Sequence, residues 1–62
     1  MRVIEETIAG LAILNNYEVL LDAENGVICA FVENYRNMTS EDVNRLFNLN
    51  WEHNHEEWVK YV

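Results

Sequence analysis

The sequence predicts a small α+β domain, an antiparallel sheet with two helices on one face, in the order α-β-β-α-β-β. Three observations support this fold class. Apolar residues recur at helical period over residues 3–15, two β-rich runs flank Asn25-Gly26, and a helix-capping sequence begins at Thr39. With 62 residues, of which 50% are hydrophobic, the chain is expected to form a single compact domain, residues 1–62.

The first helix is predicted over residues 3–15. Its apolar stripe lies at positions i, i+4, i+7 and i+8 and consists of Ile4, Ile8, Leu11 and Ala12. Asn15 and Asn16 are expected to end the helix in a left-handed conformation. Gly10 costs about 1 kcal/mol relative to alanine in a helix interior, which indicates close packing of the helix on the sheet.

A β-hairpin is predicted about Asn25-Gly26, because both residues tolerate the positive φ of a two-residue hairpin loop. Counting outward from this loop gives the pairs Glu24–Val27, Leu21–Ala30, Leu20–Phe31, Val19–Val32 and Glu18–Glu33. Side chains alternate between the two faces of a strand. The predicted core face is wholly apolar and consists of Tyr17, Val19, Leu21, Ala23, Ile28, Ala30 and Val32.

The opposite face of this hairpin is acidic. Its carboxylates are Glu18, Asp22, Glu24 and Glu33. They surround a small apolar island formed by Leu20, Val27, Cys29 and Phe31. Because Glu18 lies directly opposite Glu33, this like-charge pair is expected to be mildly destabilising.

A second helix is predicted from its capping sequence. Thr39 precedes Asp42 by three residues, as in a capping box, and Met38 with Val43 matches a hydrophobic staple. The predicted buried stripe consists of Val43, Leu46 and Phe47. The helix is expected to end near Asn48 or Asn50.

Two structures are compatible with the C-terminal residues. One is a second hairpin of residues 49–53 and 57–62, with Trp51 facing Trp58 across a turn near Asn54-His55. The other is a terminal helix capped by Asn54. The hairpin is favoured, because Trp, Val and Tyr are concentrated in the last five residues. Both tryptophans are expected in the core, since a domain this short has little other apolar mass.

The sequence predicts neither an enzyme nor a cofactor. His53 and His55, with Glu52, Glu56 or Cys29, offer too few ligands for a zinc site, and both histidines are expected in a solvated turn. The Cys29 thiol has no helix N-terminus or cation to activate it. With two glycines there is no glycine-rich phosphate loop, and little room is expected for a pocket of ~300 Å³ or more.

The charge of the chain bears on its partners. The chain has eleven acidic and four basic residues, a net charge of -7. Direct nucleic-acid binding is not expected, because binding to phosphates needs a basic surface. The longest apolar run, residues 8–14, is far shorter than the roughly 20 residues of a membrane span. A free thiol and the lack of a basic signal segment predict a cytoplasmic location without membrane contact. Acidity of this degree is also typical of proteins whose charge serves solubility alone.

Small size, acidity and the lack of catalytic motifs together resemble one class of proteins. Phage and mobile-element inhibitors, including anti-CRISPR proteins and other DNA mimics, share these properties over the whole chain. The resemblance rests on no motif, so it assigns no residue. It implies a stoichiometric, non-enzymatic inhibitor of a basic protein or ribonucleoprotein complex in the host cytoplasm.

From the residues themselves, the acidic face of the hairpin is the expected partner-binding surface. The residues expected to bind are Glu18, Leu20, Asp22, Glu24, Phe31 and Glu33. A second acidic cluster, Glu52, Glu56 and Glu57, is expected to extend this surface. The alternative is a structural or adaptor subunit, or a homodimerising domain, that uses the same hairpin face.

Overall fold

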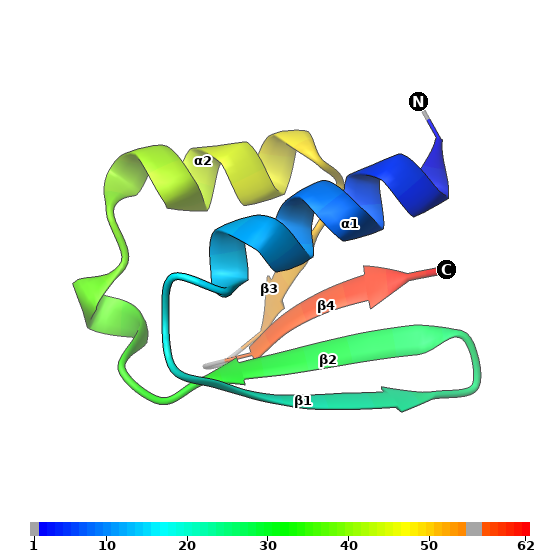
Figure 1. The fold of residues 1–62 in the computed structure, drawn as a ribbon, viewed down its shortest axis with the longest axis horizontal. Coiled ribbons are helices and arrows are strands. Elements are labelled where there is room, and N and C mark those ends of the chain that lie inside the picture. Colours follow the sequence, from blue (N-terminus) through cyan, green and yellow to red (C-terminus); the bar gives the residue numbers. More distant parts are fainter. Residues whose placement is uncertain (1, 55–56) are drawn as a thin grey trace.

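The computed structural model describes residues 2–54 and 57–62 and has the predicted α+β architecture (Figure 1). Its elements are α1 (Val3–Leu14), β1 (Val19–Glu24), β2 (Val27–Val32), the 3₁₀ helix η1 (Tyr35–Asn37), α2 (Ser40–Asn48), β3 (Glu52–Asn54) and β4 (Glu57–Tyr61). The four strands form one antiparallel sheet in the order β1-β2-β4-β3. Both helices lie on the same side of this sheet, so among the described elements none of the helices covers its other face (Figure 1).

The first hairpin has the register that the sequence predicts. Glu24 pairs with Val27 and Val19 with Val32, about a loop in which Asn25 (φ 52°) and Gly26 (φ 77°) both have positive φ. The backbone N–H of Glu33 donates to the carbonyl of Glu18 over 3.2 Å, so the expected like-charge pair is also present. The Asn-Gly loop therefore determines which side chains share a face of the sheet.

The buried face of α1 differs from the predicted one. Ile4 and Ile8 are 73% and 62% exposed, whereas the side of the helix that meets the sheet is partly polar. Its buried residues are Glu6, Thr7, Gly10 and Leu14. Hydrophobic periodicity thus selects the wrong side of this helix, because two contacts with distant residues, at Gly10 and at Glu6, determine how it packs.

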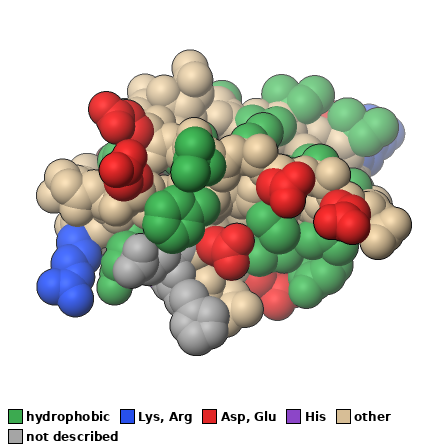
Figure 2. Space-filling model, turned by 90° about the horizontal axis from the view of Figure 1, so that it is seen from below, with side chains coloured by type: hydrophobic (Ala, Val, Ile, Leu, Met, Phe, Trp, Pro, Cys, Tyr) green, Lys and Arg blue, Asp and Glu red, His purple; other side chains and the backbone are tan. Residues whose placement is uncertain are grey.

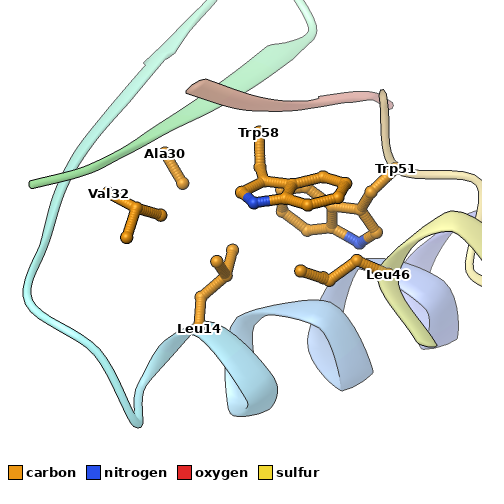
Figure 3. Packing of buried hydrophobic residues seen from close by; sticks show 6 residues of the cluster. All are labelled: Leu14, Ala30, Val32, Leu46, Trp51 and Trp58. Atoms are coloured by element: carbon orange, nitrogen blue, oxygen red, sulfur yellow. The ribbon is translucent and has the colours of Figure 1, made fainter. Parts of the chain in front are cut away.

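At Gly10 the helix contacts the indole of Trp51. A Cβ atom at this position would lie 2.0 Å from Trp51 Nε1, so only glycine leaves room for the ring. The indole N–H donates to the carbonyl of Glu6 over 3.1 Å. Trp51 and Trp58, each 1% exposed, lie between the sheet and the helices (Figure 3), which confirms that both belong to the core. The close packing expected at Gly10 is therefore present, although its partner is Trp51 rather than a strand.

At Glu6 the helix forms a buried ion pair with β4. Lys60 Nζ donates to Glu6 Oε1 over 2.7 Å and to the carbonyl of Leu49 over 3.1 Å. The second carboxylate oxygen accepts from Asn50 Nδ2 over 2.7 Å. The hydrogen bond from Lys60 holds the pKa of the Glu6 carboxyl below its ordinary value, against burial that raises it, and the Asn50 amide adds to the lowering. The ion pair joins the first helix to the last strand of the chain.

The capping of α2 and its end at Asn48 are as predicted, and Val43 and Leu46 pack in the core, but Phe47 and the predicted left-handed end of α1 differ. Thr39 Oγ1 accepts from the backbone N–H of Asp42 over 3.1 Å, and Leu46 is fully buried. Phe47 is 50% exposed and meets Trp58 edge-on at the rim of the core, with ring centroids 5.0 Å apart. The left-handed asparagine is Asn50 (φ 63°), after α2, whereas Asn15 is right-handed (φ -64°) and Asn16 does not have positive φ.

The C-terminal hairpin is confirmed, with a different register. His53, not Trp51, lies opposite Trp58. Trp51 lies before β3, because its backbone N–H donates to the carbonyl of Leu46 in α2 over 3.0 Å. Its indole N–H donates to α1 instead of the indole packing opposite Trp58 in the sheet. The turn expected near Asn54-His55 includes residues outside the described part of the chain.

The core face of the first hairpin is only partly covered. Ala30 and Val32 of the central strand β2 are buried, as expected. On β1, however, Leu21 is 55% exposed and Ala23 is also exposed. β1 is an edge strand, and the helices do not cover the end of this strand near the hairpin loop.

Replacing Gly10 by alanine tests the contact with Trp51. Helix propensity favours alanine by about 1 kcal/mol, but the added methyl must displace a buried indole, which typically costs about 1–3 kcal/mol. We expect Gly10→Ala to lower the free energy of unfolding in chemical denaturation. Ala12→Gly, on the exposed side of the same helix, serves as the control and should lose only the propensity difference. A more stable Gly10→Ala protein would contradict the contact.

The Glu6–Lys60 pair predicts a loss of stability in acid. Because the pKa of Glu6 is lowered on folding, its contribution is complete above the ordinary value of 4.5 and is lost as the pH falls through the lower folded-state pKa. We expect the Tm of the wild type to fall in this range and that of Glu6→Gln to fall less. At neutral pH Glu6→Gln should be the less stable, since Lys60 is left without its counter-ion. Circular dichroism measures both, and Glu5→Gln, at an exposed site, is the control. Parallel pH profiles for Glu6→Gln and the wild type would contradict the role of the pair.

Candidate protein-binding surface

Acidic residues gather on the face of the sheet that lies away from the helices. They come from β1, β3 and β4 and from the residues next to β1 and β2. Strand alternation and register place six carboxylates on this side: Glu18, Asp22, Glu24, Glu33, Glu52 and Glu57. We call it the acidic sheet face. Of the nine residues that the sequence predicts for binding, Glu56 lies outside the described part of the chain, and the other eight share this face.

An apolar island separates the carboxylates of β1 from those of β3 and β4. One cross-strand row runs Asp22–Cys29–Val59–Glu52, and the next runs Leu20–Phe31–Glu57–Asn54. Val59 and Tyr61 extend the island beyond the residues that the hairpin predicts. Both could have been found from the alternation of Glu57, Val59 and Tyr61 along the last strand. Figure 2 shows acidic side chains distributed around apolar ones on this side of the molecule.

The island is accessible to a partner. Leu20 is 71% exposed, Tyr61 is exposed, and Phe31 is half-buried. The free thiol of Cys29 is half-buried beside Val59. Apolar groups rimmed by charge are typical of surfaces that bind other proteins.

Three of the four basic residues form ion pairs with carboxylates that do not belong to this face. Arg2, the residue before α1, pairs with Glu5 over 3.3 Å, and Arg45 pairs with Glu41 over 3.1 Å within α2. Lys60 is buried with Glu6 on the other side of the sheet. Among the described residues, no carboxylate of the acidic sheet face forms an ion pair. The charge of this face is therefore not neutralised within the described part of the protein.

Two hollows lie beside carboxylate pairs of this face. One, of about 640 Å³, is lined by Tyr17, Glu18, Val32, Glu33, Asn34 and Asn37. The other, of about 300 Å³, is lined by Asp22, Glu24, Asn25, Val27 and Cys29. The expectation that so small a domain has little room for a hollow of this size is thus wrong. Both are open hollows at the two ends of the hairpin, where a side chain from another molecule could enter.

The described residues form no metal site. They contain no group of three His, Cys, Asp or Glu side chains that could hold a metal ion. His53 does not lie in a solvated turn, as the sequence suggested. It is half-buried in β3, its ring 4.7 Å from that of Trp58 and 5.7 Å from that of Tyr35, and its Nε2 is buried with no hydrogen-bond partner among the described residues. His55 lies outside the described residues.

Comparison with known proteins identifies no relative: no protein-family model, curated protein or solved structure matches the chain. Within the described residues, no helix has the length and apolar character needed to cross a membrane.

Repulsion between Glu18 and Glu33 on this face is expected to lower the free energy of unfolding. Replacing Glu33 by glutamine removes the repulsion from Glu18, and we expect a gain of about 0.2–1 kcal/mol in the free energy of unfolding at low salt. The gain should shrink in high salt, which screens the repulsion. Glu41→Gln is the control, because that carboxylate pairs with Arg45 and its loss should not stabilise the protein. Urea unfolding at two salt concentrations measures the difference. Equal effects of the two substitutions would show that the Glu18–Glu33 pair carries no net repulsion.

Proposed function

We propose that this protein is a non-enzymatic inhibitor that uses the acidic sheet face to bind the basic surface of a nucleic-acid-binding protein or ribonucleoprotein complex. One observation carries the proposal. Six carboxylates without an ion pair among the described residues surround a partly exposed apolar island on the side of the sheet away from the helices. In plain solubilising charge, by contrast, acidic residues are interspersed with basic ones over the surface.

The carboxylates would occupy positions that the target normally offers to phosphates. Acidic groups two residues apart on a strand, such as Asp22 and Glu24, are spaced by about 7 Å, so successive basic side chains of a target could each find a partner. The two hollows, beside Glu18–Glu33 and beside Asp22–Glu24, would receive lysine or arginine side chains. Long-range attraction between the two surfaces would also speed association.

The apolar island supplies what charge alone does not. Most of the affinity of an interface comes from a few well-buried contacts near its centre, with polar residues around them. Leu20 and Phe31 lie adjacent at the middle of the first hairpin, between its two acidic ends. Contact with this pair would exclude water from the centre, and the surrounding charges would select a basic partner.

The mechanism that follows is stoichiometric occlusion, in keeping with the resemblance to anti-CRISPR proteins and DNA mimics. The protein would occupy a nucleic-acid channel or groove in the host cytoplasm, without chemistry or cofactor. Self-association through the same face is less favourable, because a two-fold axis would bring like charges together. Sedimentation should therefore give a monomer, whereas a tight dimer through this face would contradict the proposal.

Charge reversal on the face tests the function. The protein is immobilised and exposed to a lysate of candidate host cells, and the captured proteins are identified by mass. We expect a nucleic-acid-binding protein whose affinity falls on the order of tenfold or more between about 50 mM and 200 mM salt. Purified target should bind this protein and nucleic acid competitively. Glu18→Lys with Glu33→Lys should abolish binding.

The control for this experiment is a variant with the same change in net charge on the helix side. Glu5→Lys with Glu41→Lys alters two exposed carboxylates on the helices, whose surface pairs contribute little to stability. It should retain binding. Equal loss in both double variants, salt-independent binding, or a target that binds nucleic acid and this protein together would contradict the proposal.

A further inference from the structure

The sheet has an unprotected edge along β1. β1 is the first strand in the order β1-β2-β4-β3, and within the described part of the chain it pairs with β2 alone. Natural proteins usually protect such an edge with proline, charged side chains (above all lysine) or a bulge, or cover it with another element. The sequence of β1, Val-Leu-Leu-Asp-Ala-Glu, contains no proline and no lysine, and its register with β2 is unbroken. Its two charged side chains, Asp22 and Glu24, repel an acidic strand but not a basic one. The edge is therefore open to pairing with a further strand.

The pairing pattern identifies the backbone groups that are available. The hydrogen bond from Glu33 N–H to the carbonyl of Glu18 marks that pair as a bonded one. Because bonded and non-bonded pairs alternate along an antiparallel ladder, the even-numbered residues of β1 bond to β2. The residues whose N–H and C=O groups point outward are then Val19, Leu21 and Ala23.

An apolar groove lies beside this edge on the helix-bearing side of the sheet. It has a volume of about 450 Å³ and is lined by Ile8, Leu11, Ala12, Leu14, Asn15, Val19 and Leu21. Ile8 and Leu21 are 62% and 55% exposed within it. The side chains of a strand added at the edge would alternate, as those of β1 do, so every second one would enter this groove.

On the other side of the same edge the surroundings are acidic. The remaining side chains of an added strand would lie beside Glu18, Asp22 and Glu24. A second copy of β1 would place its own three carboxylates there, which like-charge repulsion disfavours. A segment with apolar residues on one side and lysine or arginine on the other complements both the groove and the carboxylates.

We propose that β1 binds an extended segment of a basic partner as an additional strand. In this binding mode the main-chain hydrogen bonds supply affinity and the alternate side chains supply specificity. The segment alternates apolar and basic residues, with the apolar ones in the groove and the basic ones on the acidic sheet face. This proposal rests on the proposed function for the basic character of the partner, and it adds the binding mode, which is strand addition at β1.

A synthetic peptide of alternating lysine and valine, blocked at both ends, is the probe. At about ten times its Kd, the peptide should slow hydrogen exchange of the amides of Val19, Leu21 and Ala23 about tenfold, because these amides become bonded. Leu20 and Asp22 already bond to β2, so their exchange should change less. Two-dimensional NMR of the full chain measures all five amides in one titration.

Backbone methylation of the peptide provides a matched pair of controls. The valines, whose side chains enter the groove, are the residues whose N–H groups face β1. Methylation of the valine nitrogens should weaken binding at least about tenfold. Methylation of the lysine nitrogens, on the far edge of the added strand, should leave it unchanged. Equal binding of the two methylated peptides, unchanged exchange at the edge, or no binding of the probe would overturn the proposal.

Two substitutions on α1 test the groove from the protein side. Ile8→Lys places a charge in the groove, and Ile4→Lys places the same charge on the same helix outside it. Because both side chains are exposed, both variants should fold, and only Ile8→Lys should lose affinity for the probe, by about tenfold. Equal affinities would overturn the docking mode. A captured target that depends on Glu18 and Glu33 but not on Ile8 would likewise overturn it, while the proposed function would stand.

Discussion

The buried contact between Glu6 and Lys60 determines the arrangement of the rest of the molecule. It joins the first helix to the last strand, and the Asn50 amide and the Leu49 carbonyl complete its hydrogen bonds. A buried charge without a partner is strongly destabilising, so α1 has to present Glu6, and with it Gly10, to the sheet. The Trp51 indole then fits against Gly10 and donates to the Glu6 carbonyl. Both helices are thereby held on one side, and the other side of the sheet stays uncovered.

The same contact shapes the charge of the surface. It removes Lys60 from the surface of a chain that has four basic residues, while Arg2 and Arg45 pair with nearby carboxylates of α1 and α2. The sheet carboxylates have no internal counter-ion among the described residues, and their repulsion opposes folding. A domain of this size has a small margin of stability, which here depends on two fully buried tryptophans. Retaining an uncompensated acidic face at this cost is consistent with a face that binds a basic partner.

Local signals in the sequence were sufficient for the parts of the fold that local geometry determines. The Asn25-Gly26 loop specifies the hairpin register, and Thr39 specifies the start of α2, because loop and cap geometry depend on neighbouring residues alone. The orientation of α1 is not local. Residues Ile4 and Ile8 form the more hydrophobic side, but the long-range pairing of Glu6 with a residue 54 positions away in the chain selects the other. In the candidate site, Glu52 and Glu57 were expected to extend the acidic face, and the register of β3 and β4 places them there. The groove beside β1 could not be foreseen while much of its lining was assigned to the core.

The misassigned side of α1 has a physical consequence. Aliphatic side chains that periodicity assigns to the core, Ile8 and Leu21, remain in contact with water beside an open strand edge. Burying such surface is favourable by about 25 cal/mol per Å², and strand pairing at the edge would satisfy backbone groups at the same time. β1 therefore takes part in two surfaces, its even-numbered side chains in the acidic face and its odd-numbered ones in the groove. A partner that contacts both needs basic and apolar residues in alternation, a requirement more selective than attraction to negative charge alone.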